Sequence, residues 1–239
     1  SLFDGQELKR SFLNKMSLEG NKILNYGYAQ GYKPLIDYLA EYMKSKGADV
    51  KNKKILITNG FTEAFDIVLS TLTESGDNVL CENPTHNTAI KIMKLHKLNI
   101  VGINEEKDGM NTEDLKAVLK SRPFKLAYLI PSYHNPTGTV MSPDKRVELY
   151  DIFKNYNVPI IEDGFNEELR YSGAHVSPMA ALGQHSNGVI YLGSFSKILF
   201  PGLRIGWIFG DEKLIDYMES VKRSRNIHTS VLDQAVLCD

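Results

Sequence analysis

The chain has 239 residues, 42% of them hydrophobic, which is enough to bury the core of one large domain. Its 28 basic and 29 acidic side chains nearly cancel, which excludes the charge excess typical of proteins that bind nucleic acid or membrane surfaces. No apolar run approaches the roughly 18 residues of a membrane span, and two cysteines, Cys81 and Cys238, are too few for a disulfide framework, so we predict a cytoplasmic protein.

The predicted elements begin with a helix over 34–45, where apolar side chains recur at helical spacing. From residue 54 onward, short apolar runs alternate with helical segments. The predicted strands are 54–58, 78–81, 99–101, 126–130, 158–161, 189–192 and 204–209. The predicted helices are 62–72, 85–95, 111–120, 143–155 and 213–223, with Asn111 and Ser142 as N-caps. This alternation predicts an α/β domain over 49–239, with a mostly parallel sheet of about seven strands and helices on both faces, preceded by an N-terminal arm and helix over 1–48.

Polar residues follow several of these strands, where open α/β sheets bind ligands. After the first strand, Asn59-Gly60-Phe61-Thr62 opens directly into a helix, whose free N–H groups attract anions, although Gly60 alone fits a plain turn equally well. Glu82-Asn83-Pro84-Thr85-His86 follows the second strand. His86 offers a ring that can stack on a ligand, but a lone histidine is more often a surface residue.

Two further junctions carry amide and carboxylate groups. The first is Pro131-Ser132-Tyr133-His134-Asn135-Pro136-Thr137-Gly138, a run of generic turn formers. The second, Glu162-Asp163, ends the fifth strand and leads into an acidic loop. We expect Glu167 and Glu168 of that loop to be solvated.

The most informative block is Gly193-Ser194-Phe195-Ser196-Lys197, followed closely by Arg204. A lysine between small hydroxyl residues, with an arginine nearby, suits an aldehyde cofactor that carries a phosphate. The amine would form an imine and the neighbouring groups would hold the phosphate.

This block and the junctions before it resemble, in order and spacing, the class I/II aminotransferases, which depend on pyridoxal 5'-phosphate (PLP). The resemblance covers nearly the whole chain and implies the large domain of a fold-type I PLP-transferase. It implies that Lys197 is the catalytic residue and carries PLP as a Schiff base. The other residues implied to bind the cofactor are Ser194, Arg204, Phe61 and Thr62 around the phosphate, and His86, Asn135 and Asp163 around the ring.

The resemblance also assigns roles within that set and shows two departures. Asp163 would keep the pyridine nitrogen protonated, and Asn135 would hydrogen-bond the ring's 3'-oxygen. His86 stands where the family usually has a stacking tyrosine or tryptophan. Phe165 stands where it usually has a tyrosine that donates to the 3'-oxygen. Tyr26 matches a tyrosine that reaches the phosphate of the neighbouring subunit, which implies a homodimer with shared active sites.

Three functions stay open at this level. The first is an aminotransferase acting on an amino acid and a 2-oxo acid, in which Lys197 moves the α-proton. The second is the aminotransferase-like effector domain of a MocR/GntR-type transcription regulator, which residues 161–171 resemble; nucleic acid would then bind only through an upstream domain. The third is another PLP reaction, such as β-elimination.

The ends of the chain suggest a part of a longer protein, since it begins at Ser1 and its last residue, Asp239, falls within a helical pattern. In the family, a C-terminal small domain supplies the arginine that grips the substrate carboxylate, and we expect that domain to be absent from this chain. The identity of the amino acid is therefore not predicted. No metal site is predicted.

Overall fold

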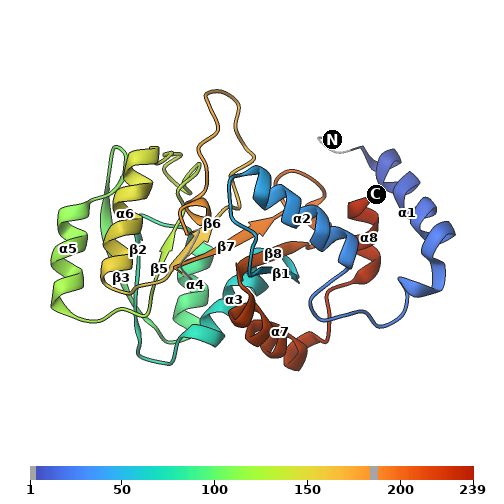
Figure 1. The fold of residues 1–239 in the computed structure, drawn as a ribbon, viewed down its shortest axis with the longest axis horizontal. Helices are drawn as coiled ribbons and strands as arrows, with labels where there is room; N and C mark the ends of the chain where they lie inside the picture. The colour runs from blue at the N-terminus through green and yellow to red at the C-terminus, as the bar shows by residue number, and fades with distance from the viewer. Residues whose placement is uncertain (1–3, 184–187) are drawn as a thin grey trace.

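The computed structural model describes residues 4–183 and 188–239, and its centre is an eight-stranded mixed sheet (Figure 1). Four successive pairs from β7 to β3 are parallel, whereas β8 runs antiparallel to both of its neighbours and β4 runs antiparallel to β3. This confirms the predicted mostly parallel α/β sheet. The spatial order of the strands is β1 (Lys53–Thr58), β8 (Gly206–Asp211), β7 (Val189–Ser194), β6 (Ile160–Asp163), β5 (Leu126–Leu129), β2 (Asn78–Asn83), β3 (Asn99–Glu106) and β4 (Gly109–Met110).

The strand that sequence patterning did not predict is β4, which has two residues and folds back on the end of β3. Gly109 turns the chain there with a φ of +109°, a conformation that side chains with a Cβ rarely adopt. Two residues are too few to show an alternating pattern, which is why the sequence predicted about seven strands.

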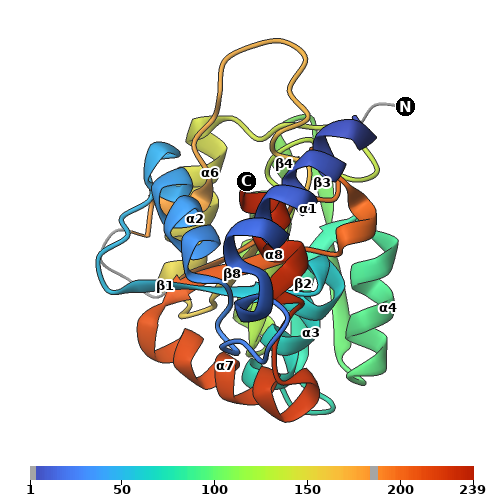
Figure 2. The same ribbon diagram turned by 90° about the vertical axis from the view of Figure 1, so that its right-hand side faces the viewer.

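The strands contribute side chains to two hydrophobic cores, one on each face of the sheet, because successive side chains of a strand point to opposite faces. In β1, for example, Ile55 and Ile57 belong to one core and Leu56 to the other. The first core is covered by α2 (Lys33–Ser45), α5 (Thr112–Ser121) and α6 (Pro143–Asn155), and the second by α3 (Gly60–Leu72), α4 (Asn87–Leu95) and α7 (Glu212–Asn226). Figure 2 shows α2 and α6 on one side of the sheet and α3, α4 and α7 on the other.

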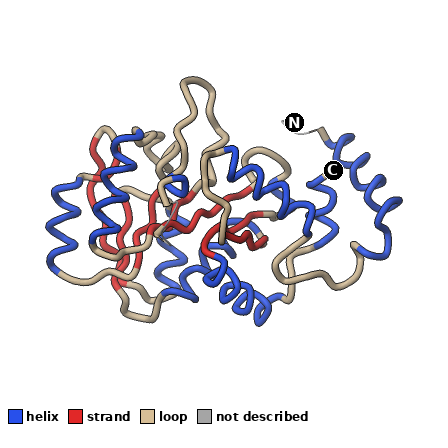
Figure 3. The backbone as a smooth tube through the Cα atoms, in the orientation of Figure 1, coloured by secondary structure: helices blue, strands red, loops and turns tan. Residues whose placement is uncertain are grey.

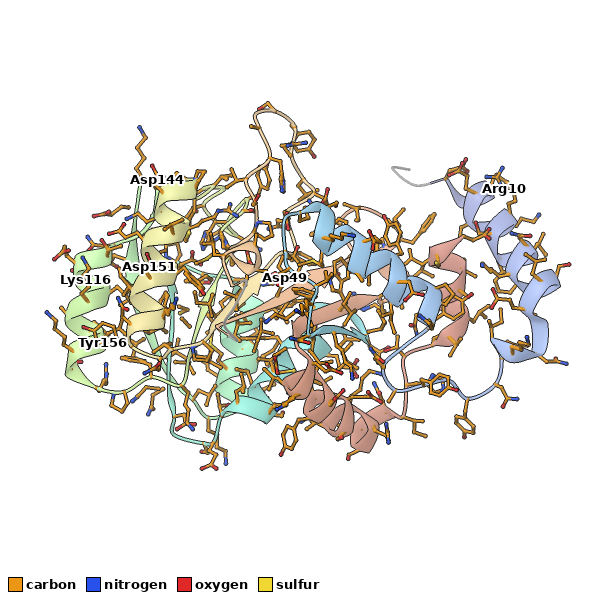
Figure 4. The ribbon with its side chains drawn as sticks, in the orientation of Figure 1. Arg10, Asp49, Lys116, Asp144, Asp151 and Tyr156 are labelled. Atoms are coloured by element: carbon orange, nitrogen blue, oxygen red, sulfur yellow. The ribbon has the colours of Figure 1, made fainter. Side chains whose placement is uncertain are left out.

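At one end of the molecule, α1 (Gly5–Glu19) packs against α8 (Val231–Cys238), where Asn14 donates a hydrogen bond of 2.8 Å to Asp239. Arg10 on α1 and Lys116 on α5 mark the two ends of the long axis (Figure 4). None of the residues of α1 is buried, although Leu8, Phe12 and Met16 recur at helical spacing along it. This helix was not predicted from the sequence.

The element boundaries near the strand ends differ from the predicted ones. Helix α3 begins two residues earlier, at Gly60. Strand β8 begins at Gly206 because a short 3₁₀ helix, Pro201–Leu203, ends in Arg204 with left-handed backbone angles. A long loop over 164–178 joins β6 to the 3₁₀ helix Met179–Ala181 and rises from the body of the molecule (Figure 3). No helix in the described part of the chain is long and apolar enough to span a bilayer.

Candidate active site

The predicted site residues gather at one edge of the sheet, where β1, β2, β5, β6 and β7 all end. The register pairs Thr58 of β1 and Ser194 of β7 with the same residue of β8, Gly206. Because β1, β8 and β7 are neighbours, the start of α3, the chain leading into β8 and the segment that carries Lys197 lie side by side at this edge.

Arg204 and Gly60 form an anion cradle at the start of α3. Gly60 has a φ of +76°, and a Cβ atom there would lie 2.6 Å from Nη2 of Arg204, so the guanidinium rests directly on the glycine backbone. The one hydrogen bond recorded for this guanidinium among the described residues is a weak one of 3.5 Å, to the Pro201 carbonyl. The N-cap residue of α3 is Asn59, and no capping hydrogen bond from a described side chain reaches the first turn of this helix. A free guanidinium beside uncapped N–H groups attracts a phosphate.

Two hydroxyl side chains lie near this cradle. Ser194 is buried at the end of β7 and donates to the Ser196 hydroxyl at 3.1 Å. Thr62 is exposed in the first turn of α3. The structure thus brings Ser194, Arg204 and the start of α3 to one region.

An aromatic group borders the lysine. The rings of His86 and Phe165 are nearly parallel, at 18°, with centroids 6.3 Å apart, and Phe61 packs against both. The Lys197 ammonium lies 5.0 Å from the centre of the Phe165 ring. Burial, and then the charge of Lys197, lowers the pKa of His86, so its imidazole is neutral at neutral pH.

Asp163 is buried at the end of β6 and accepts two hydrogen bonds. The Tyr128 hydroxyl donates to one carboxylate oxygen, and the Phe165 N–H donates to the other at 3.0 Å. Burial raises the pKa of Asp163 to about 6, although both hydrogen bonds oppose that shift. The carboxylate is therefore mainly ionised at neutral pH. Sequence reasoning did not identify Tyr128. Its side chain lies in the same core as that of Ile161, and Ile161 is two residues before Asp163, so strand alternation places Tyr128 and Asp163 on the same face of the sheet.

Asn135 lies in the loop after β5, and its side-chain amide forms no hydrogen bond with the described residues. Two contacts fix this loop. The Asn166 amide donates to the Tyr133 carbonyl at 3.0 Å, which joins the loop to the segment after Asp163. The guanidinium of Arg146, which is buried, donates to the Pro131 carbonyl and the Ser132 hydroxyl, both at 2.9 Å. Arg146 was not identified from sequence, because its role depends on residues distant in the chain.

Tyr26 stands apart from the other predicted residues. Its side chain is 81% exposed, and its ring meets the edge of His228 at a centroid distance of 6.0 Å. Within this chain it therefore contributes nothing to the group around Lys197.

The prediction of a solvated acidic loop was wrong for Glu167. This side chain is buried, accepts a hydrogen bond of 2.5 Å from Tyr191, and lies 3.1 Å from the Lys46 ammonium. Glu168 is partly exposed but also pairs with Lys46 and accepts a hydrogen bond from Tyr42. These contacts hold the loop against α2. A carboxylate can be buried there because cations and hydrogen-bond donors compensate its charge.

Comparison with known proteins places this geometry in a family. A family model described as aminotransferase class I and II matches residues 4–237. The chain is 33% identical to aromatic-amino-acid aminotransferase 1 of Thermococcus litoralis, over 96% of this chain and 56% of that protein. It is 31% identical to the HTH-type transcriptional regulator YdfD of Bacillus subtilis, over 90% of this chain and 45% of that protein.

The fold agrees with the same family. The crystal structure of Pyrococcus horikoshii kynurenine aminotransferase, in complex with PMP, KYN and KYA, matches with a TM-score of 0.93 and 33% identity, over 99% of this chain and 60% of that one. The chain spans about half the length of the curated relatives it matches. It belongs to the family of class I and II aminotransferases.

Proposed function

We propose that this protein is a PLP-dependent aminotransferase that moves an amino group between an amino acid and a 2-oxo acid. The observation that carries the proposal is the convergence of Lys197, the His86 and Phe165 rings and the Arg204 guanidinium at one sheet edge. These groups fit an aromatic aldehyde with a phosphate, since the cradle suits the phosphate and the amine suits the aldehyde. When bound, PLP withdraws electrons from the substrate carbon that loses its proton.

The cradle would hold the phosphate. Arg204 would donate charge-assisted hydrogen bonds, which are about twice as strong as neutral ones, and the N–H groups of Phe61 and Thr62 would add the field of the α3 N-terminus. The hydroxyls of Thr62 and Ser194 would supply further donors. Support comes from the guanidinium itself, whose one hydrogen bond within residues 4–183 and 188–239 is the weak contact with Pro201.

The residues around the ring would orient it and set its charge. His86, neutral because of burial and the nearby lysine, would stack on one face. Asp163 would hold a proton on the ring nitrogen, and its two donors, Tyr128 and Phe165 N–H, fix the carboxylate for that contact. Asn135, with its amide free, would hydrogen-bond the ring's oxygen.

Lys197 would attach the cofactor and then move the proton of the substrate α-carbon as a general base and acid. This role is supported by the position of its ammonium beside the aromatic group, 5.0 Å from the centre of the Phe165 ring. Proximity of this kind converts an intermolecular proton transfer into an intramolecular one.

A homodimer with shared sites is part of the proposal. Tyr26, exposed on this chain, would reach the phosphate in the partner subunit. We also place the protein in the cytoplasm, which is supported by the two free cysteines, Cys81 and Cys238.

The first test is the visible absorption spectrum of the purified protein with added PLP, beside Lys197→Ala. A band of lysine-bound PLP is expected for the wild type and for Lys213→Ala, a control that removes an exposed lysine elsewhere. Adding amino acids one at a time should remove the band and release a 2-oxo acid. A band that survives unchanged in Lys197→Ala would refute the assignment of this lysine.

A second function is favoured by one observation, the 31% identity to an HTH-type transcriptional regulator over 90% of this chain. In that case the domain would bind PLP and an amino acid as an effector. The same experiment separates the two functions. An effector domain would change its spectrum with an amino acid but release no 2-oxo acid, whereas an aminotransferase would release it in proportion to the band that is lost.

A further inference from the structure

A second polar cluster lies at the same sheet edge but on the opposite face. Glu82 lies near the end of β2, Glu105 lies near the end of β3, and His134 follows β5. These strands are parallel neighbours, so their carboxyl ends meet. Leu80 and Ile103, two residues before the glutamates, belong to the core under α5 and α6, whereas Tyr128 and Ile161 belong to the other core. The cluster therefore lies on the other face of the sheet from the proposed cofactor site.

The three side chains converge on a small volume. His134 Nε2 lies 3.2 Å from a Glu82 oxygen, and His134 Nδ1 lies 3.5 Å from a Glu105 oxygen. One ligand atom from each residue lies within 4.8 Å of the others. In a tetrahedral zinc site, two ligands at about 2.1 Å from the ion are about 3.4 Å apart. The Glu82 and His134 atoms are already that close, at 3.2 Å, and Glu105 would have to shift by up to about 1.4 Å to complete the site.

Two buried atoms in this cluster lack a hydrogen-bond partner in the described part of the chain. They are Oε1 of Glu82, whose residue is 1% exposed, and Nε2 of His134, whose residue is 3% exposed. The other Glu82 oxygen accepts from the Ile130 N–H at 2.9 Å, so the carboxylate is only half satisfied. A buried polar atom without a protein partner is costly unless an ion or a water binds it.

The charges in the cluster do not balance without a further cation. Two carboxylates and one imidazolium sum to −1 in a buried place. An uncompensated buried charge is costly, and a bound cation would compensate it.

We propose that Glu82, Glu105 and His134 bind one divalent transition-metal ion, such as Zn²⁺. One imidazole nitrogen and two carboxylates suit Zn²⁺ better than Mg²⁺ or Ca²⁺, which prefer oxygen ligands alone. The ion would enter as His134 releases its proton, so the two negative and two positive charges cancel. Thr137, whose hydroxyl lies 2.8 Å from His134 Nδ1, and water would complete the surroundings.

The consequence is a link between the sheet and the loop of the proposed cofactor site. His134 directly precedes Asn135, so a metal bound to Glu82 and Glu105 would fix that loop to β2 and β3. The site is proposed from the cluster alone and does not depend on the activity of the protein.

The test uses the full chain, stripped with a chelator and then equilibrated with Zn²⁺ near neutral pH. Elemental analysis after removal of free metal should find one zinc per chain in the wild type. His134→Gln should weaken zinc binding at least 100-fold, as expected when a ligand nitrogen is lost. His175→Gln, which removes an exposed histidine of the loop over 164–178, is the matched control and should keep one zinc.

A second variant and a second metal keep the test decisive. Glu105→Gln replaces a partly exposed residue and should also weaken zinc binding. It tests the site even if His134→Gln does not fold. Co²⁺ in the wild type should give d–d absorption bands of nitrogen and oxygen ligation that are lost in the folded variant. Wild-type protein that retains no zinc above the buffer, or folded variants that retain as much as the wild type, would overturn the proposal.

Discussion

Gly60→Ala tests the anion cradle with one methyl group. The new Cβ would lie 2.6 Å from Nη2 of Arg204, at a φ of +76°. An alanine in the left-handed region costs about 1–2 kcal/mol of folding free energy. The guanidinium is the far end of a flexible side chain, so it can retreat to a contact distance of roughly 3.5–4.0 Å. The protein should therefore fold, with its guanidinium displaced from the start of α3.

The displacement should appear mainly in the affinity for PLP. A hydrogen bond to a charged group contributes about 1.5–3 kcal/mol, so losing one from the phosphate weakens binding about 10- to 150-fold. The assay titrates cofactor-free protein with PLP and follows the band of lysine-bound PLP. Urea unfolding of the same samples, without PLP, measures the separate cost to the fold.

Gly202→Ala is the matched control, because a Cβ there meets no atom within 4 Å although the residue lies in the 3₁₀ helix that leads to Arg204. Its PLP affinity should equal that of the wild type. Folded Gly60→Ala protein that binds PLP as tightly as the wild type would refute the cradle.

Three further predictions follow from the site and its surroundings. Phe165→Tyr adds a hydroxyl donor, which would bond the 3'-oxygen of bound PLP in the proposed site. It should lower the pKa of the lysine-bound cofactor by about one unit in a spectral pH titration. A titration with no downward shift would contradict the role given to this position. Lys46→Met leaves the buried Glu167 without its cation and should cost about 3 kcal/mol in urea unfolding, whereas Lys44→Met, at an exposed ion pair, should cost under about 0.5 kcal/mol. Burial raises the pKa of Glu162 to about 7, so the folded state keeps a proton that the unfolded state releases near pH 4. The contribution of this proton to the unfolding free energy is present at low pH and is lost as pH rises from about 4 to about 7. Glu162→Gln should flatten that decline, and an unchanged slope would count against the assignment.

The sheet was predictable because each strand and helix carries its own period in the sequence. Runs such as 126–130 are apolar at every position, which is typical of a strand buried on both faces. The strand β4 has only two residues and can show no such pattern, so it was not predicted. Helix α1 was also not predicted, although Leu8, Phe12 and Met16 recur in it at helical spacing. Local periodicity thus predicted the layers of the fold but not every element outside them.

The candidate site residues could be proposed from the sequence because they lie at or after strand ends. Asp163 is the last residue of β6, and His86, Asn135 and Lys197 lie in the segments after β2, β5 and β7. The burial of Glu167 was missed because its partners are Lys46, which caps the C-terminus of α2, and Tyr191 in β7. The cluster around His134 was missed for the same reason, since its contacts exist only after β5, β2 and β3 have paired.

The glycines around Lys197 explain why a short motif can specify a site. A Cβ on Gly193 would lie 2.1 Å from the Trp207 ring, and one on Gly206 would lie 2.8 Å from the backbone of Gly60. Both clashes involve rigid groups, so larger residues would push β7, β8 and the start of α3 apart. These glycines take no part in the chemistry. They bring three backbones close enough for Ser194, Arg204 and the start of α3 to lie around the proposed phosphate site, which is why their spacing carries as much information as the lysine itself.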